Sequence, residues 1–317
     1  MMHPLSFHAK GKILLTGEYL VLKGAEALAV PLMVGQGIII ERGSKGDILS
    51  WSASDTRGIW FKGEFRLPDL EMVYVTDQII ANRLKGILLA ARELNPAFLV
   101  GSGGLKVVTQ LEFNRNWGFG SSSTLTSLIA QWAGIDPMNL HRMISKGSGY
   151  DVACSRADGP IIFSLRGGKP QITPVDFNPP FGHLMQLIYL DSKQDSDMEV
   201  EAFGRLAETD LSGDISRISG ISNLLSSVKD THAFISLLSE HEEIIGKILG
   251  RETVKSRLFS DFDGVVKSLG AWGGDFVLAL SSQGSEYTAD YFRMKSHGIV
   301  VPYSTLVRLP FVKEMIT

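Results

Sequence analysis

The stretch NWGFGSSSTLTSLI, residues 116–129, is the segment that decides the fold of this chain. Two glycines, Gly118 and Gly120, and three serines, Ser121, Ser122 and Ser123, come directly before an apolar run with the character of a helix. Backbone N–H groups in such a loop can converge on one point, and the first turn of a helix adds partial positive charge. The stretch therefore predicts an anion site, with the phosphate tail of a nucleotide as the expected occupant.

The loop departs from the two common nucleotide-binding patterns. It lacks the lysine of the G-x-x-x-x-G-K-[ST] loop, and its glycines do not have the G-x-G-x-x-G spacing. A helix N-cap with spare serines explains the same residues, because serine is a favoured cap residue. Taken by itself, the loop leaves the phosphate site and the simple cap as open alternatives.

Composition narrows the classes of protein. The chain has 317 residues, of which 44% are hydrophobic and 21% charged, as in ordinary globular proteins. A net charge of −3 offers no basic field for nucleic acid, and the single cysteine excludes an intramolecular disulfide and fits a reducing compartment. No apolar run approaches the ~20 residues of a membrane span. We expect a cytoplasmic protein without a signal peptide, a nucleic-acid partner or a membrane partner.

Strands and helices mix in both halves of the chain without regular alternation, which favours an α+β fold over a doubly wound sheet. Helical spacing covers residues 77–94, 122–133, 137–145, 199–211, 215–228 and 231–249. Short apolar runs at 13–15 and 19–22, joined by Thr16-Gly17-Glu18, predict two strands around a tight turn. Glycine and proline clusters near residues 167–180 predict a domain boundary, giving domains 1–178 and 179–317.

Three further segments accompany the loop. They are AKGKILLTGEYLVL at residues 9–22, GSGYDVA at residues 147–153, and KSLGAWGGDF at residues 267–276. Together with the loop, in this order, the segments resemble the motifs of the GHMP kinases, a superfamily that includes galactokinase, homoserine kinase, mevalonate kinase and phosphomevalonate kinase. One such motif is weak evidence, whereas four in order across almost the whole chain are strong evidence.

The resemblance implies a two-domain fold, an activity and two cofactors. The N-terminal domain, residues 1–178, would bind ATP and resemble domain 2 of ribosomal protein S5. The C-terminal domain, residues 179–317, would be ferredoxin-like. The implied activity is phosphoryl transfer from ATP to a small molecule, with Mg²⁺ to neutralise charge across the phosphate oxygens.

The resemblance also assigns roles to single residues. It makes Asp151 the catalytic aspartate and Lys12 the cation beside the reacting oxygen, against the ordinary alternatives of an Asx turn and a solvated strand lysine. It places Ser122 at the magnesium ion, with Glu18 as a second candidate ligand because residues 139–145 contain no carboxylate. The nucleotide-binding residues that it implies are Gly118, Gly120, Ser121, Ser122, Ser123, Gly273 and Gly274.

Details of the motifs point to phosphomevalonate as the acceptor. Tyr19 stands where mevalonate kinases usually carry a histidine, and Gly273-Gly274-Asp275 is similar to the phosphomevalonate kinase motif. Trp272 departs from the pattern, since the family normally has a small residue there, and we expect the ring to reshape the site beside the phosphates. An anionic acceptor needs positive charge to offset repulsion, and the candidates are Lys10, Arg115, Lys146, Arg156 and Lys193.

Three alternatives stay open. Mevalonate is the second candidate acceptor, and a protein of this fold that binds a nucleotide or metabolite without transferring phosphate is the second class of function. A sugar or homoserine kinase is a weaker reading, because no galactokinase-like signature appears near the N-terminus. The sequence also leaves the choice between a monomer and a homodimer undecided.

Overall fold

The computed structural model describes residues 3–191, 196–205, 210–270, 272 and 275–307. The chain divides into two compact units. The first consists of Met1–Gly11, Val34–Arg115 and Phe119–Arg156, and the second of Lys12–Met33, Asn116–Gly118 and Ala157–Thr317. The boundary predicted at residue 178 lies within the second unit, and the division of the chain at that point stays a prediction.

The first unit is built on a twisted sheet whose strands follow the order β5-β4-β3-β6-β2, with β1 also paired to β2. The strands are β1 (Leu5–Leu14), β2 (Ala27–Arg42), β3 (Ile48–Asp55), β4 (Gly58–Arg66), β5 (Glu71–Val75) and β6 (Leu105–Leu111). β3 and β6 run parallel, while β2–β6, β3–β4 and β4–β5 are antiparallel. β1 and β2 are long, and each contributes residues to both units.

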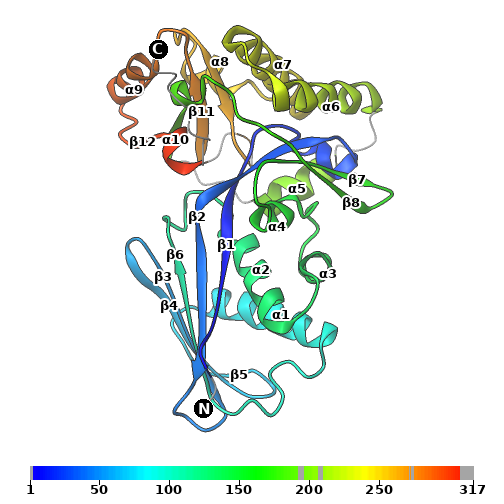
Figure 1. The fold of residues 1–317 in the computed structure, drawn as a ribbon, viewed down its shortest axis with the longest axis vertical. Helices are drawn as coiled ribbons and strands as arrows, with labels where there is room; N and C mark the ends of the chain where they lie inside the picture. Colours follow the sequence, from blue (N-terminus) through cyan, green and yellow to red (C-terminus); the bar gives the residue numbers. More distant parts are fainter. Residues whose placement is uncertain (1–2, 192–195, 206–209, 271, 273–274, 308–317) are drawn as a thin grey trace, which may run out of the picture. The chain divides into compact units, whose positions relative to one another are not determined.

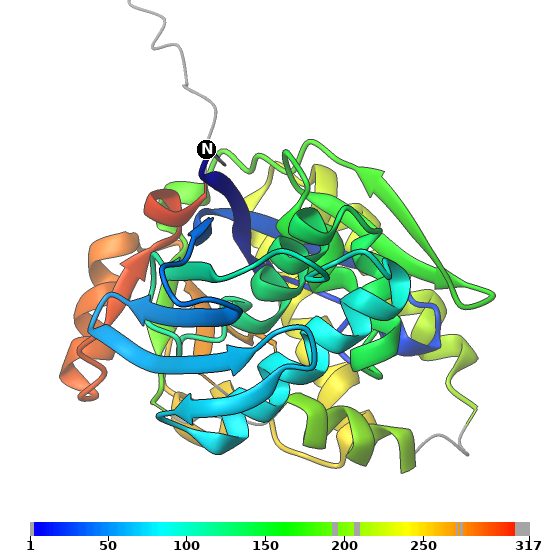
Figure 2. The same cartoon turned by 90° about the horizontal axis from the view of Figure 1, so that it is seen from below.

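Helices cover one face of this sheet (Figures 1 and 2). They are α1 (Gln78–Leu94), α2 (Ser121–Ala133), α3 (Pro137–Ile144) and α4 (Tyr150–Ser155). α1 begins where the Asp77 side chain accepts two backbone N–H bonds, and α3 begins at Pro137 with Asp136 as its cap. The apolar stripe of α1, including Leu84 and Leu88, packs into a core shared with β2, β3, β4, α2 and α3.

The second unit contains a four-stranded antiparallel sheet in the order β10-β11-β9-β12. The strands are β9 (Gln186–Tyr189), β10 (Val265–Ser268), β11 (Phe276–Leu280) and β12 (Val300–Pro302). Helices separate β9 from β10 and β11 from β12, so the chain follows the β-α-β-β-α-β order of a ferredoxin-like unit. β7 (Ile161–Arg166) pairs with Ala27–Ala29 of β2 and with β8 (Lys169–Pro174).

Helices complete the second unit. They are η1 (Leu20–Lys23), η2 (Gly182–Leu184), α5 (Ser196–Arg205), α6 (Ser212–Ser227), α7 (Thr231–Leu249), α8 (Val254–Leu258), α9 (Ser285–Met294) and α10 (Tyr303–Leu306). α6 and α7 lie side by side (Figure 1) and contact each other. α7 also packs against β10, while the α8 and α9 side chains join a core with Val266, Val277 and Ile188 of the sheet.

The α+β class expected from the sequence is confirmed, but one of the strands predicted from the sequence is wrong. The run at residues 19–22 falls on the short helix η1 (Leu20–Lys23) and its N-cap Tyr19 instead of on a strand. Tyr19 adopts φ 61° and Gly24 adopts φ 96°, so the backbone turns sharply at both ends of this apolar run. No helix in the described part of the chain is long and apolar enough to cross a membrane.

Candidate functional site

The glycine-serine loop forms the start of α2, as the motif predicts. Gly118 and Gly120 both adopt left-handed conformations, with φ of 65° and 94°, which glycine reaches without the steric cost of a side chain. Gly120 occupies the N-cap position, no side chain caps the helix there, and its first turn contains no acidic residue. The cap residue therefore offers no side-chain acceptor to the first N–H groups of α2, at an end of the helix that favours anions.

The three serines of the loop have different surroundings. The Ser123 hydroxyl is buried and donates to the Gly120 carbonyl at 2.9 Å, so it closes the first turn. Ser122 is exposed, and Ser121 is half-buried. Thr124 Oγ1 donates to Oε1 of the buried Gln36 on β2 at 2.7 Å, which fixes the start of α2 to the sheet. Of the three, Ser122 offers the most accessible hydroxyl.

Asp151 lies in the first turn of α4, which packs against α2 in the first unit. The two helices are joined by a bond between the hydroxyls of Ser127 and Ser155 at 2.6 Å. Asp151 is half-buried, and its Oδ1 accepts from the backbone N–H of Val152 at 2.9 Å. Within the first unit, the structure thus brings the helix of the phosphate loop and the helix of the predicted catalytic aspartate together.

Lys12 lies near the end of β1, in the second unit, and is largely buried at 9% exposure. Its Nζ donates to the carbonyl oxygen of Gly118 at 3.2 Å. Asp275 approaches the same glycine, because a Cβ at Gly118 would lie 2.8 Å from Asp275 Oδ2. The second unit therefore brings residues of the first and third motifs together at Gly118.

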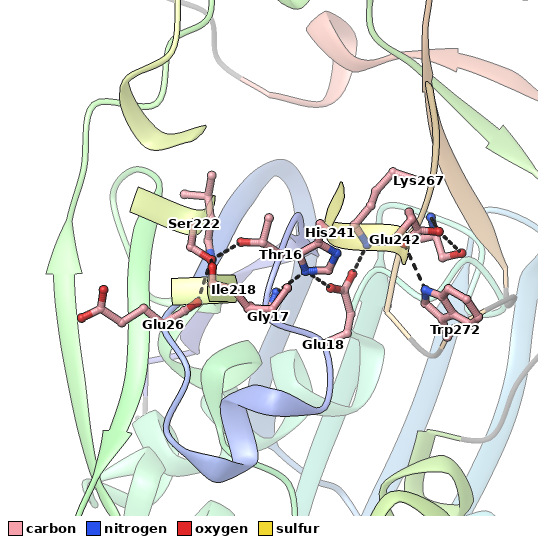
Figure 3. Close-up of polar contacts among 12 residues, drawn as sticks. Thr16, Gly17, Glu18, Glu26, Ile218, Ser222, His241, Glu242, Lys267 and Trp272 are labelled. Atoms are coloured by element: carbon pink, nitrogen blue, oxygen red, sulfur yellow. Dashed lines mark hydrogen bonds and ion pairs between the residues drawn. The ribbon is translucent and has the colours of Figure 1, made fainter. Parts of the chain in front are cut away.

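Glu18 occupies a fully buried polar cluster (Figure 3). Its Oε1 lies 2.6 Å from Nζ of Lys267, and its Oε2 lies 3.3 Å from Nε2 of His241. Burial raises the pKa of the Glu18 carboxyl in spite of the opposing Lys267 charge. Magnesium usually keeps several of its waters when it binds to proteins. A buried carboxylate already paired with an ammonium group is a poor candidate for the predicted magnesium ligand.

Trp272 is buried, with 3% exposure, and its indole Nε1 donates to Oε1 of Glu242 at 3.0 Å (Figure 3). The ring packs closely against α7, since a Cβ built at Gly246 would lie 3.0 Å from Trp272 Cη2. Glycine at 246 leaves the space that this ring uses. The large residue that interrupts the family pattern therefore has a packing and hydrogen-bonding role inside the second unit.

Some predicted residues lie outside the part of the chain that the structure describes. These are Gly273, Gly274 and Lys193. Among the other cations proposed for the acceptor, Lys146 and Arg156 are exposed, Lys10 is half-buried, and Arg115 lies 4.9 Å from the centre of the Trp60 ring. The described residues contain no group of three His, Cys, Asp or Glu side chains arranged to hold a metal.

Sequence reasoning missed several residues that position these segments. His141, on α3, bonds through Nε2 to the carbonyl of Gly147 at 3.1 Å, just before the Asp151 helix. Ser155 joins α4 to α2 through the Ser127 hydroxyl, and no motif in the sequence marks it. Glu242 and Lys267 belong to elements far from Glu18 in sequence, so no local pattern could have paired them. The one sequence feature that could have indicated this buried ion pair is the charged Lys267 within an otherwise apolar strand.

This protein resembles known proteins in its three-dimensional structure but not detectably in its sequence. No protein-family model matches the sequence, and no curated protein matches it. The structure is similar to a Lin0012 protein from Listeria innocua, with 15% identity, a TM-score of 0.70, and coverage of 93% of this chain and 96% of that chain. It is also similar to Streptococcus pneumoniae phosphomevalonate kinase in complex with phosphomevalonate and AMPPNP, with 15% identity, a TM-score of 0.67, and coverage of 94% and 97%.

Methanococcus jannaschii mevalonate kinase is a third similar structure, with 14% identity, a TM-score of 0.65, and coverage of 94% of this chain and 97% of that chain. This chain has the GHMP kinase fold. The fold class that the four motifs predicted is thereby confirmed over almost the whole length of the chain. At this level of identity the likeness concerns the GHMP kinase fold, and the reaction and its substrate are matters for a proposal.

Proposed function

We propose that this protein is an ATP-dependent phosphotransferase that phosphorylates phosphomevalonate to diphosphomevalonate in isoprenoid synthesis, as a cytoplasmic enzyme. One observation carries the proposal. The predicted phosphate loop opens an uncapped helix at Gly120, and the carbonyl of Gly118 in the same loop accepts from the Lys12 ammonium group. An anion-favouring helix start with a buried lysine at its loop is suited to bind and polarise a polyphosphate.

The proposed donor site uses the start of α2. The backbone N–H groups of the first turn would bind phosphate oxygens, and the exposed Ser122 hydroxyl would take part in holding magnesium together with those oxygens and water. Magnesium supplies neutralisation of charge on the triphosphate. Glu18 is left out of this ligand set because it is buried and paired with Lys267. Gly273 and Gly274 stay in the proposal as nucleotide-binding residues on the motif alone.

Asp151 and Lys12 are the proposed catalytic residues. The Asp151 carboxylate, in the first turn of α4, would orient the acceptor oxygen or accept its proton. Lys12, as a cation largely shielded from water, would stabilise negative charge on the attacking oxygen and the transferring phosphoryl group. Such groups are effective because little covalent chemistry is required of the protein in phosphoryl transfer.

The acceptor assignment depends on charge and on the motif details. A phosphate monoester loses its second proton near pH ~6, so its oxygen is anionic at neutral pH and needs a cation more than a base. Lys12 meets that need, and the Tyr19 and Asp275 positions are similar to those of phosphomevalonate kinases. The fold is compatible with this acceptor, since the similar S. pneumoniae phosphomevalonate kinase structure is a complex with phosphomevalonate and AMPPNP.

An ADP-release assay with Mg²⁺ and ATP tests the proposal, with phosphomevalonate and mevalonate measured side by side. We expect release with phosphomevalonate. ADP release with mevalonate alone would make mevalonate the acceptor in place of phosphomevalonate. Absence of ADP release with both compounds would overturn the proposal that the protein is an enzyme. In that case, ATP protection against thermal unfolding without turnover would indicate a nucleotide-binding protein, for which ligand at 100 times Kd adds ~2.7 kcal/mol of stability.

A further inference from the structure

A closed ring of polar contacts joins the first and third motifs within the second unit, and Figure 3 shows its members Glu18, Lys267, Glu242 and Trp272. Glu18 Oε1 lies 2.6 Å from Lys267 Nζ, which in turn lies 3.1 Å from Glu242 Oε1. The same Glu242 oxygen accepts from the Trp272 indole at 3.0 Å. The backbone N–H of Trp272 donates to the Tyr19 hydroxyl at 3.1 Å, and Tyr19 follows Glu18 in the chain, so the ring is complete.

The ring is buried throughout, which makes stability a poor explanation for it. Lys267 has no exposed surface, and Glu18 and Glu242 are each 2% exposed. Removing charges from water costs more than a buried ion pair usually returns, and apolar residues of similar volume often stabilise a fold equally well or better. The backbone that these side chains hold in place explains them better than a gain in stability does.

The ring surrounds a backbone turn with an unusual conformation. Tyr19 adopts φ 61° and ψ −50°, and residues with side chains rarely adopt such a positive φ. Gly17 adopts φ 89° and lies so close to β2 that a Cβ would be 2.5 Å from the Ala27 side chain. The Gly17 N–H donates to His241 Nε2 at 2.9 Å. Such conformations persist when the surroundings determine them, and they gather at functional sites.

The protonation states agree with the hydrogen bonds of the ring. Burial opposes the charge of Lys267, but the Glu18 and Glu242 carboxylates raise its pKa above the usual value, so it remains an ammonium donor. Burial and the Lys267 charge keep the pKa of His241 well below 6.5, so the ring is neutral, and the Gly17 N–H donated to Nε2 assigns its single proton to Nδ1. Burial raises the pKa of Tyr19 to about 12, which preserves its hydroxyl.

We propose that Glu242, Lys267 and Trp272 are positioning residues that fix the turn at residues 17–19 for phosphoryl transfer. Lys12 belongs to the strand that leads into this turn, and its Nζ contacts the phosphate loop at Gly118. Fixing the turn therefore fixes the strand end that carries the proposed catalytic cation. This inference rests on the proposed function. It also explains Trp272, because a small residue there could not supply the indole donor to Glu242.

Trp272→Phe tests the ring of contacts, and a control substitution elsewhere matches its loss of buried volume. Phenylalanine keeps an aromatic ring but removes the N–H donor, while Glu242 retains Lys267 and the backbone N–H of Ser268 as partners. We expect kcat for ADP release to fall at least ~10-fold with a change below ~3-fold in the acceptor KM, since a misplaced transition-state group lowers kcat. Glu242→Gln, which keeps an oxygen acceptor for the indole, should lose less than Glu242→Ala.

Trp51→Phe is the matched control. Trp51 lies on β3 in the core of the first unit and is 3% exposed, the same as Trp272. The Trp51→Phe protein should be less stable than the wild type but should keep its kcat. The second readout needs no activity: amide hydrogen exchange across residues 16–20 should become at least ~10-fold faster in Trp272→Phe and stay unchanged in Trp51→Phe, because exchange reports local opening.

The outcomes separate the two proposals. If the wild-type protein releases no ADP with either acceptor, the proposed function has failed. Amide hydrogen exchange at residues 16–20, compared between the wild type and Trp272→Phe, then tests by itself whether the ring fixes the turn. If the wild-type protein is active, the ring proposal stands only when kcat falls and exchange rises together in Trp272→Phe. Unchanged exchange, or an unchanged kcat in a folded variant, overturns it.

Discussion

Lys12 donates through its Nζ atom to the carbonyl oxygen of Gly118 at 3.2 Å, and only 9% of its surface is exposed. Most lysines on strands keep their ammonium group in water. This one lies against the loop that the sequence marks as a phosphate site, so its charge acts in surroundings where electrostatic interactions are stronger than in water.

Lys12→Met should lower turnover by at least ~10²-fold while the protein stays folded, because methionine retains the apolar stem and removes the charge that stabilises the reacting oxygens. Steady-state ADP release measures the loss. Lys106→Met is the control, since Lys106 is an exposed strand lysine whose ion pair with Glu41 lies at the surface. Equal turnover in the Lys12 variant and the wild type would remove Lys12 from the mechanism.

Asp151→Ala should also lower turnover by at least ~10²-fold, because the variant has no group to orient the acceptor or accept its proton. The Asp151 carboxylate accepts from the adjacent Val152 N–H, a local contact, so we expect a small change in thermal stability. Asp69→Asn, at an exposed position of the same unit, should change neither property. A variant that loses its fold together with its activity would show that Asp151 serves as a structural cap.

Gly246→Ala should destabilise the protein by ~1–3 kcal/mol, as overpacking of a core does. The new Cβ would lie 2.8 Å from the Arg251 carbonyl oxygen and 3.0 Å from Trp272 Cη2. Gly220→Ala is the matched control in the neighbouring helix α6, where a Cβ meets nothing within 4 Å. That change should be neutral or stabilise by up to ~1 kcal/mol through helix propensity. Urea unfolding of both variants decides, and equal midpoints would contradict the packing argument.

His241 predicts a loss of stability in mild acid. Burial and Lys267 lower the pKa of His241 well below 6.5. Below pH about 6.5, this histidine is therefore protonated in the unfolded chain but still neutral in the folded protein. The contribution is fully present above that pH, and it declines by up to ~1.4 kcal/mol per pH unit as the pH falls. The raised pKa of Glu18 acts in the opposite direction, because there the folded state binds the proton first.

Chemical unfolding between pH about 5 and 7 measures this slope. His241→Gln keeps an oxygen that can accept from the Gly17 N–H and removes the titrating group, so the slope should become shallower by about one proton. His183→Gln, at an exposed histidine, should leave the slope unchanged. Identical slopes in all three proteins would show that His241 takes up a proton in the folded state.

The sequence by itself determined the elements whose signals are local. The helix expected at residues 77–94 is α1, and the apolar run after the glycine-serine loop is α2, because caps and helical spacing lie within a few turns of chain. Four short motifs in order were enough to predict the fold, because their order resembles that of the GHMP kinases. The run at residues 19–22 was misjudged because apolar content alone does not reveal the positive φ of Tyr19.

The tertiary structure decided which distant residues meet. Lys267 bonds to Glu18 across 249 positions, and the Trp272 N–H bonds to the Tyr19 hydroxyl across 253 positions. Periodicity reports which face of an element is apolar, but it carries no information about which element covers that face. Only the folded chain shows that Glu18 lies in a buried ion pair and that the Trp272 ring occupies the space beside Gly246. Both follow from burial, which is a property of the packed molecule.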